Sequence, residues 1–218
     1  MKTALTSASD SRLAAVILMG GKGARLGGVD KTQLLIGNRT AFHWVYGRVS
    51  PYVTRTYCSV ANAEAAKGLS LPVIMDDEDR RGDAGVADVI LGCLRHVRDE
   101  LPETAQMTHL LTCPVDTPFI PENLVPSLAQ AAGERSNAVA SAYGQLHGLH
   151  ALWSFSCVDE FASLVEKHGI RKLSALHDAL EAVRVEFPVR EGLDPFLNIN
   201  TQADLQQANV LAVSVKNP

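Results

Sequence analysis

The sequence reads LAAVILMGGKGARLGGVDK from Leu13 to Lys31, and this stretch joins an apolar segment to a glycine-rich one. The continuous apolar run from Leu13 to Met19 is typical of a strand buried on both faces of a parallel sheet. Gly20 and Gly21 end that run. We therefore predict a central parallel strand at the start of the fold, followed by a glycine-rich loop.

The loop after this strand has the composition of a phosphate-binding loop. Six of the sixteen glycines fall in one short stretch, at positions 20, 21, 23, 27, 28 and 37. Glycine allows positive φ and close backbone approach, so successive N–H groups can converge on phosphate oxygens. Lys22, Arg25 and Lys31 add the matching positive charge. A bare flexible turn explains this stretch less well, because a turn does not need three basic residues.

Two common phosphate motifs are excluded by the spacing. A Walker A loop requires Gly-Lys-Ser/Thr, whereas the pair Lys31-Thr32 follows Asp30. A dinucleotide fingerprint requires a third glycine where positions 24–26 read Ala-Arg-Leu, and an acid about 20 residues further on. Dehydrogenase chemistry therefore ranks low.

Beyond the loop, strand-like and helix-like patterns alternate along the chain. We predict further strands at 55–60, 71–75, 109–113, 138–142, 150–153 and 184–187. We predict helices at 40–49, 86–97, 121–132, 157–167, 171–180 and 202–210. Such alternation implies right-handed crossovers onto a mostly parallel sheet covered on both faces. The predicted fold class is a three-layer α/β domain over residues 13–218, preceded by a flexible leader at 1–12.

Composition excludes several classes of function. Twenty Lys and Arg against twenty-four Asp and Glu give a net charge of −4, which lacks the positive field of a nucleic-acid-binding protein. The first apolar run is far shorter than the roughly 20 residues that cross a membrane. The four cysteines are too widely spaced for a zinc knuckle or a disulfide framework. We expect a cytoplasmic protein with no membrane and no nucleic-acid partner.

Three motifs, in order along residues 13–210, resemble those of one known family. They are Leu18-x-Gly-Gly-x-x-x-Arg25-x-Gly-Gly-x-Asp30-Lys31, then Cys113-Pro-Val-Asp-Thr-Pro-Phe-Ile-Pro121, then Phe196-Leu-Asn-Ile-Asn-Thr-x-x-Asp-Leu205. They are similar to motifs of the MobA-like nucleotidyltransferases, which act on molybdopterin. The Gly-Gly-x-Asp-Lys ending resembles the guanylyltransferase branch. The resemblance implies a Rossmann-like nucleotidyltransferase fold.

The resemblance also implies a reaction and its nucleotide site. An enzyme of this branch uses Mg²⁺ to transfer GMP from GTP to molybdopterin, with or without bound molybdenum, and releases pyrophosphate. Its implied partners are these substrates and other proteins of molybdenum cofactor biosynthesis or molybdoenzyme maturation. The implied site residues are Leu18, Met19, Gly20, Gly21 and Asp76 for the nucleotide, Arg25 and Lys31 for the triphosphate and catalysis, and Asp116 for nucleotide, metal and catalysis.

The chemistry fits these residue types without the resemblance. Nucleotidyl transfer depends on positioning the two substrates and on neutralising pyrophosphate as it leaves. Mg²⁺ prefers carboxylate, phosphate and water oxygens, which suits Asp116 and Asp76. On our strand assignment Gly20, Asp76 and Asp116 all follow strand ends at one edge of the sheet, where open α/β sheets bind ligands.

On the acceptor side the resemblance implies Asn198, Asn200 and His147 as contacts. Simpler roles remain open for the same region. Thr201 and Asp204 have the spacing of a capping box at a helix start, and His147 with His150 suits packing. In the same way, Asp116 suits a turn between prolines and Asp76 suits a solvated acidic loop.

The chain departs from the family pattern in three places. Residues 81–88 read RGDAGVAD where the family carries a Gly-Pro-Leu-Ala-Gly-like loop, and Val60 replaces an asparagine, with Asn62 close by. Gly148 follows His147 where a proline is usual. Two alternatives therefore stay open: a cytidylyltransferase or other small-acceptor nucleotidyltransferase, and a non-catalytic nucleotide-binding relative.

Overall fold

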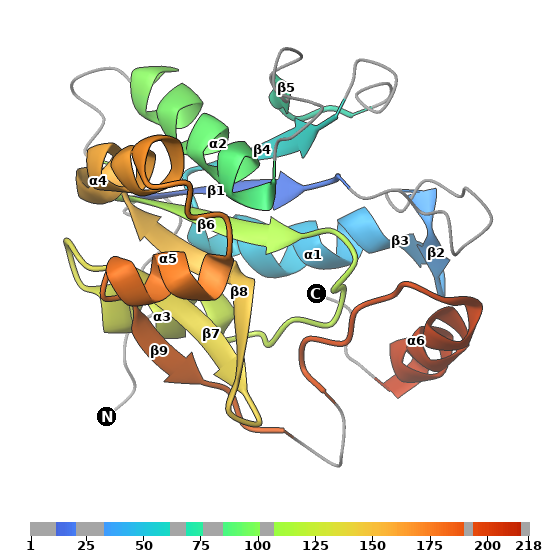
Figure 1. The fold of residues 1–218 in the computed structure, drawn as a ribbon. Coiled ribbons are helices and arrows are strands. Elements are labelled where there is room, and N and C mark those ends of the chain that lie inside the picture. The colour runs from blue at the N-terminus through green and yellow to red at the C-terminus, as the bar shows by residue number, and fades with distance from the viewer. Residues whose placement is uncertain are drawn as a thin grey trace.

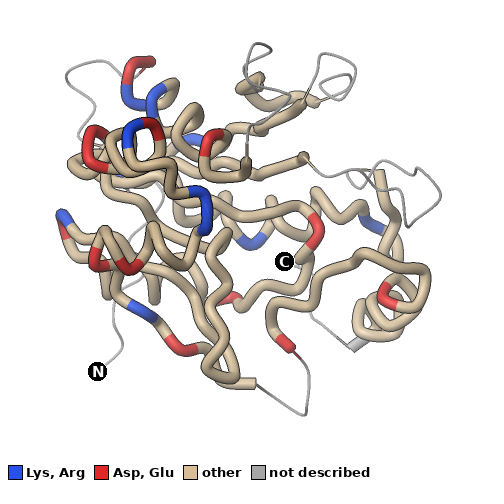
Figure 2. The backbone as a smooth tube through the Cα atoms, in the orientation of Figure 1, with Lys and Arg blue, Asp and Glu red and all other residues tan. Residues whose placement is uncertain are grey.

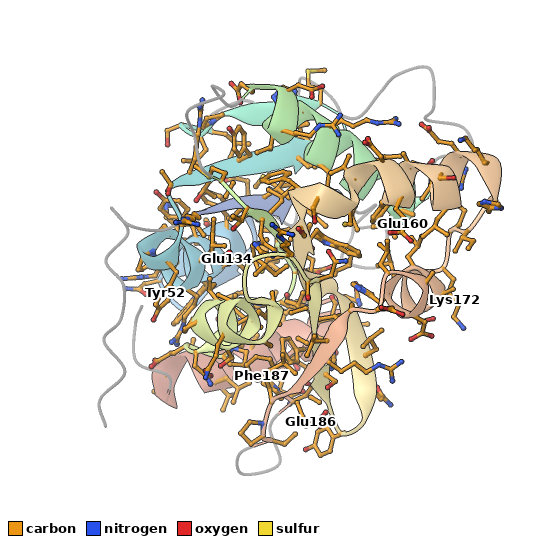
Figure 3. The ribbon with its side chains drawn as sticks, turned by 90° about the vertical axis from the view of Figure 1, so that its left-hand side faces the viewer. Tyr52, Glu134, Glu160, Lys172, Glu186 and Phe187 are labelled. Atoms are coloured by element: carbon orange, nitrogen blue, oxygen red, sulfur yellow. The ribbon has the colours of Figure 1, made fainter. Side chains whose placement is uncertain are left out.

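The computed structural model describes residues 12–20, 33–61, 69–75, 85–100, 107–189 and 194–214. These residues form a three-layer α/β fold in which helices cover both faces of one large sheet (Figure 1). Turned by 90°, the layers are seen from the side, with Tyr52 on one side and Glu160 and Lys172 on the other (Figure 3). The predicted fold class is confirmed.

The middle layer is a sheet of seven strands: β1 Leu13–Leu18, β4 Arg55–Val60, β5 Val73–Met75, β6 His109–Pro114, β7 Ala138–Ala142, β8 Gln145–Ser154 and β9 Val183–Glu186. Their order across the sheet is β5-β4-β1-β6-β8-β7-β9. Strands β5, β4, β1 and β6 run parallel to one another, and so do β7 and β9. Strand β8 alone runs antiparallel to its neighbours. The sheet is therefore mostly parallel, as predicted.

Strand β1 is buried on both faces because its residues are all apolar. Ala15 and Ile17 belong to the core on one face, and Ala14 and Val16 belong to the core on the other. Strands β4 and β6 pair with its two edges. The predicted central strand is thus confirmed, and its last residue, Leu18, lies in the middle of the sheet.

Among the described residues, the α-helices are α1 Ala41–Val49, α2 Val86–Glu100, α3 Leu124–Ala132, α4 Val158–Ala162, α5 Leu173–Ala179 and α6 Gln202–Ser214. Side chains of α1, α3 and α6 enter the core on one face of the sheet, and those of α2, α4 and α5 enter the core on the other. None of these helices combines the length and the apolar character that a membrane span requires.

The helix predicted at 157–167 is divided into three parts. A 3₁₀ turn, η6 Phe155–Cys157, precedes α4, and a wider π-helical segment, η7 Ser163–Lys167, follows it. Phe161 and Val165 are both fully buried. The widened segment keeps both side chains against the sheet, which a regular helical spacing pattern does not reveal.

Strand β8 is longer than predicted, because the sequence indicated only 150–153. It forms a hairpin with β7 through Tyr143 and Gly144, whose φ angles are 52° and 70°. Two successive positive φ angles are those of a type I′ turn. Glu186, labelled in Figure 3, steadies this turn by accepting from the Ser141 hydroxyl at 2.6 Å and from the Gly144 N–H at 3.3 Å.

A short ribbon, β2 Leu35–Ile36 and β3 Arg39–Thr40, was not predicted. Gly37 turns between the two strands with a φ of +64°, and its N–H donates to the side chain of Asn209 in α6 at 2.8 Å. Two-residue strands are too short to show a sequence pattern. The ribbon thus connects the segment before α1 to the last helix.

Charged residues of both signs are interspersed along the described chain (Figure 2). On one face, Arg95 of α2 pairs with Glu166 at 2.7 Å and Arg98 pairs with Asp159 of α4 at 3.2 Å. Exposed pairs of this kind contribute little to stability. The described surface therefore carries charges of both signs side by side.

Candidate active site

The parallel strands end together at one edge of the sheet, and the predicted site residues follow those ends. The register places Leu18 of β1 opposite Ser59 of β4 and opposite Pro114 of β6. Met75, the last residue of β5, lies opposite Val60. This edge therefore gathers the carboxyl ends of four parallel strands.

The strand order reverses at the same edge. From β1 the chain moves outward to β4 and β5, and then returns to β6 on the other side of β1. Open α/β sheets bind ligands beyond the carboxyl ends of the strands at such a reversal. The segments that follow Leu18 and Pro114 lie on the two sides of this point.

The backbone at the end of β1 is partly used by the protein itself. The N–H of Met19 donates to the carbonyl of Ser59 at 2.9 Å, and the carbonyl of Leu18 accepts from the N–H of Val115 at 3.0 Å. Gly20 is exposed, and a Cβ added there would meet nothing within 4 Å. Of the described residues predicted to hold the nucleotide, Gly20 is therefore the one that faces open space.

Four predicted site residues lie outside the described residues: Gly21, Arg25, Lys31 and Asp76. Gly20 and Met75 are the described residues that precede these segments. The roles of the four residues in nucleotide and triphosphate binding stay predictions.

Asp116 lies in a turn that follows β6 directly. The hydroxyl of Thr117 donates to the carbonyl of Pro114 at 3.1 Å and closes this turn. Thr117 is 3% exposed, whereas Asp116 is only partly buried. The turn between prolines is therefore present, and it holds Asp116 at the edge where β1 and β6 end.

A backbone hydrogen bond brings the third motif to this turn. The N–H of Ile199 donates to the carbonyl of Asp116 at 2.8 Å, and the side chain of Ile199 is fully buried. Asn198 and Asn200 flank Ile199, and both retain solvent exposure. The structure thus brings together three predicted site residues from distant parts of the sequence.

The spacing of Thr201 and Asp204 predicted a capping box, and the structure confirms it. The carboxylate of Asp204 accepts from the N–H groups of Asn200 and Thr201 at 2.9 and 2.7 Å. In return, the N–H of Asp204 donates to the hydroxyl of Thr201 at 3.2 Å. This box begins α6 and fixes the backbone of Asn200, so the capping role and a binding role of Asn200 are compatible.

His147 packs on the segment that carries the two asparagines. Its ring stacks on Phe196 at 4.3 Å, and the ring of His150 lies 4.7 Å from the same phenyl group. Partial burial lowers the pKa of His147, although the charges of Asp194 and Glu186 oppose this shift. The packing role considered for this histidine pair is therefore confirmed, and the described contact of His147 with the acceptor-side motif is made through Phe196.

The described residues offer oxygen ligands for a cation. Among them, no three His, Cys, Asp or Glu side chains gather into one cluster, so a site made of protein ligands alone is not seen in this part of the chain. Asp116 has a carboxylate, and Asn198 and Asn200, which have amide oxygens, flank the residue whose backbone bonds to Asp116. Such a sparse oxygen set suits Mg²⁺ or Mn²⁺, which take their remaining ligands from phosphate and water.

Close packing around position 148 explains why this chain has glycine where a proline is usual. A Cβ added there would lie 3.0 Å from the Cβ of Leu173 in α5 and 3.3 Å from its Cδ1. The carbonyl of Gly148 also accepts from the Nε2 of the buried His177 at 2.9 Å. Helix α5 therefore packs so closely on β8 that a larger residue would displace it.

We expect Gly148→Ala to lower the free energy of unfolding by about 1–3 kcal/mol, the usual cost of overpacking. Urea denaturation measures this change. The control is Gly92→Ala on the exposed side of α2, where an added Cβ meets nothing within 4 Å. That variant should be stabilised, because alanine favours a helix interior over glycine. A Gly148→Ala protein as stable as the wild type would contradict the close packing.

Asp88, the last residue of the stretch that departs from the family pattern, has a structural role. Its carboxylate accepts from the N–H of Gly85 at 3.0 Å at the start of α2. The same oxygen pairs with Arg171 at 3.0 Å, and the side chain of Asp88 is only 8% exposed. Asp88 therefore caps α2, while residues 81–84 lie outside the described residues.

Comparison with known proteins gives matches along most of the chain. Residues 15–183 match the family model of the MobA-like NTP transferase domain. The chain is 36% identical over 200 residues to the molybdenum cofactor guanylyltransferase of Acidiphilium cryptum, which covers 92% of this chain and 95% of that protein.

Solved structures share the fold. Molybdopterin-guanine dinucleotide biosynthesis protein A from Archaeoglobus fulgidus superposes with a TM-score of 0.67 at 23% identity, covering 93% of this chain and 100% of that chain. A Mycobacterium tuberculosis protein in complex with manganese superposes with a TM-score of 0.62 at 15% identity, covering 92% of this chain and 98% of that chain. At these identities the likeness shows the fold alone.

Proposed function

We propose a function on the premise that the chain belongs to the family of MobA-like NTP transferases. In this proposal the protein transfers GMP from GTP to molybdopterin, which forms molybdopterin guanine dinucleotide and releases pyrophosphate. The observation that carries it is the 36% identity to a molybdenum cofactor guanylyltransferase over 92% of the chain. The geometry supports it, because backbone hydrogen bonds join the end of β1 to the turn of Asp116, and join that turn to Ile199, where the strand order reverses.

In the proposed reaction a phosphate oxygen of molybdopterin attacks the α-phosphorus of GTP. The new P–O bond forms as the bond from the α-phosphorus to the oxygen that bridges to the β-phosphorus breaks. Pyrophosphate leaves with that electron pair. Catalysis then rests on aligning the substrates and neutralising the leaving group, for which we assign Arg25 and Lys31. Leu18, Met19, Gly20, Gly21 and Asp76 hold the nucleoside in this proposal.

We further propose that Asp116 holds Mg²⁺. A bound Mg²⁺ supplies positive charge for the triphosphate, and it usually takes one or two carboxylates together with phosphate oxygens and water. The oxygen side chains of Asp116, Asn198 and Asn200 agree with this preference. The manganese complex of a protein with the same fold also agrees with a divalent cation.

The acceptor side of the site consists of Asn198, Asn200 and His147 in this proposal. The backbone of Asn200 is fixed by the capping box, and His147 is held by Phe196. Fixed side chains suit recognition of a rigid pterin, because less conformational entropy is lost on binding. We also include proteins of cofactor biosynthesis or molybdoenzyme maturation as partners, since a bound dinucleotide cofactor must be passed on.

We infer a cytoplasmic location from the cysteines. All four are buried and free in the structure. Burial raises the pKa of Cys58 and of Cys157 to about 11, so both stay as unreactive thiols. Such a set of cysteines suits a reducing compartment.

Mass analysis of the pterin product tests the proposed function. Purified protein is incubated with molybdopterin, Mg²⁺ and either GTP or CTP. A product that gains GMP with GTP alone is the expected result. A product that gains CMP would assign the chain to the cytidylyl branch, and no dinucleotide with either substrate would overturn the proposed reaction.

A further inference from the structure

The turn that carries Asp116 is held from three directions. One backbone hydrogen bond ties Val115 to β1 at 3.0 Å, and a second ties Asp116 to Ile199 at 2.8 Å. The third contact comes from β8, where the Nε2 atom of His150 lies 2.7 Å from the hydroxyl of Thr117. This third contact joins two side chains, so a substitution can remove it and leave the backbone bonds in place.

One arrangement of hydrogens makes both contacts of the Thr117 hydroxyl hydrogen bonds at once. A threonine hydroxyl has one hydrogen, and Thr117 donates it to the carbonyl of Pro114 at 3.1 Å. The hydroxyl therefore accepts from His150, whose Nε2 atom must carry a hydrogen. The result is a directed chain of two hydrogen bonds that runs from His150 through Thr117 to Pro114.

His150 is built into the core as a neutral donor. It is 3% exposed, and the ring of Phe196 packs 4.7 Å from it. Burial, together with the nearby His147, lowers the pKa of His150 to about 3, so its ring is uncharged near neutral pH. A side chain of this kind can hold a neighbour in place, but it cannot exchange protons with a substrate in solution.

We propose that His150 and Thr117 are positioning residues for Asp116, an inference that rests on the proposed function. Asp116 lies within the segment that the hydrogen-bond chain closes, between Pro114 and Thr117. These two hydrogen bonds therefore fix the turn that carries the Asp116 carboxylate. Removal of a group that orients a metal ligand usually changes metal affinity or activity by about 10–100-fold.

Four variants separate positioning from packing. His150→Leu removes the donor and keeps an apolar side chain in the core, and Thr117→Val removes the hydroxyl at nearly constant shape. His150→Gln restores an N–H donor at a similar reach. The control is His109→Leu, which removes another fully buried imidazole at the opposite end of β6, where His109 bonds to Ser136.

Two quantities are measured for each variant. One is kcat for dinucleotide formation, and the other is the affinity for Mn²⁺ in the presence of GTP, followed by electron paramagnetic resonance. We expect His150→Leu and Thr117→Val to weaken Mn²⁺ binding and lower kcat by about 10–100-fold. His150→Gln should regain most of this loss. His109→Leu should lower the melting temperature without changing either quantity.

Two outcomes would overturn the proposal. The first is wild-type Mn²⁺ affinity in both His150→Leu and Thr117→Val. The second is equal impairment of His150→Leu and His150→Gln, which would indicate that ring packing alone matters. If the wild-type protein forms no dinucleotide, the proposed function fails, whereas the Mn²⁺ measurement still decides the positioning role.

Discussion

Replacing Asp116 by asparagine is expected to lower kcat by about 1000-fold while the fold stays intact. Asp116→Asn keeps the side-chain shape and the backbone bond to Ile199, but it removes the charge proposed to hold the cation. Charge stabilisation by a bound metal is worth several kcal/mol, and about 4 kcal/mol corresponds to about 1000-fold in rate. The measurement is pyrophosphate release at saturating GTP, molybdopterin and Mg²⁺.

The matched control for this variant is Asp159→Asn. The side chain of Asp159 is 95% exposed and pairs with Arg98 at 3.2 Å on the helical surface. Its replacement should leave kcat unchanged, since exposed pairs contribute little even to stability. A wild-type kcat in Asp116→Asn would remove this residue from the proposed mechanism.

The second large effect is a steep loss of stability in acid. Burial lowers the pKa values of His109, His150 and His177 in the folded protein, that of His150 to about 3. All three rings are neutral in both states above pH 6.5, the ordinary histidine pKa, so stability is complete there. Below that pH the unfolded chain takes up protons first, and stability falls until each folded pKa is reached.

Each such histidine contributes about 1.4 kcal/mol per pH unit to this slope, so the three together give up to about 4 kcal/mol per unit. Urea denaturation between pH 7 and pH 5 measures it. His109→Leu should make the slope smaller, because it removes one buried imidazole whose pKa is lowered in the folded protein. The control, Val165→Ala, creates a small cavity in the core and should lower stability equally at every pH. An unchanged slope in His109→Leu would contradict the prediction.

The elements predicted from sequence are those whose signals are local. An unbroken apolar run such as Leu13–Leu18 can only be buried on both faces, and the structure places it at the centre of the sheet. The side chains of Thr201 and Asp204 each accept a hydrogen bond from the backbone N–H of the other residue, three positions away. Their spacing alone therefore predicted the capping box at the start of α6. The edge where Leu18 and Pro114 meet followed from the alternation of strands and helices.

The features that sequence could not reveal depend on contacts between distant residues. Strand β8 was predicted short, since the half-buried residues before His150 carry no alternating pattern, and its reversal depends on positive φ at Tyr143. The hydrogen bond between His150 and Thr117 joins positions 33 residues apart. Neither a histidine nor a threonine in the sequence indicates which distant side chain it will contact. Asn198 was singled out by resemblance, but only the Ile199 backbone shows how it reaches Asp116.

The bond between Ile199 and Asp116 sets the order in which the protein can become functional during its synthesis. The ribosome delivers the β1 and β6 strands early, and they can pair while the rest of the chain is still being made. Ile199 and the two asparagines are synthesised well after β6. A nascent chain can therefore acquire its central sheet before the segment that completes the Asp116 turn.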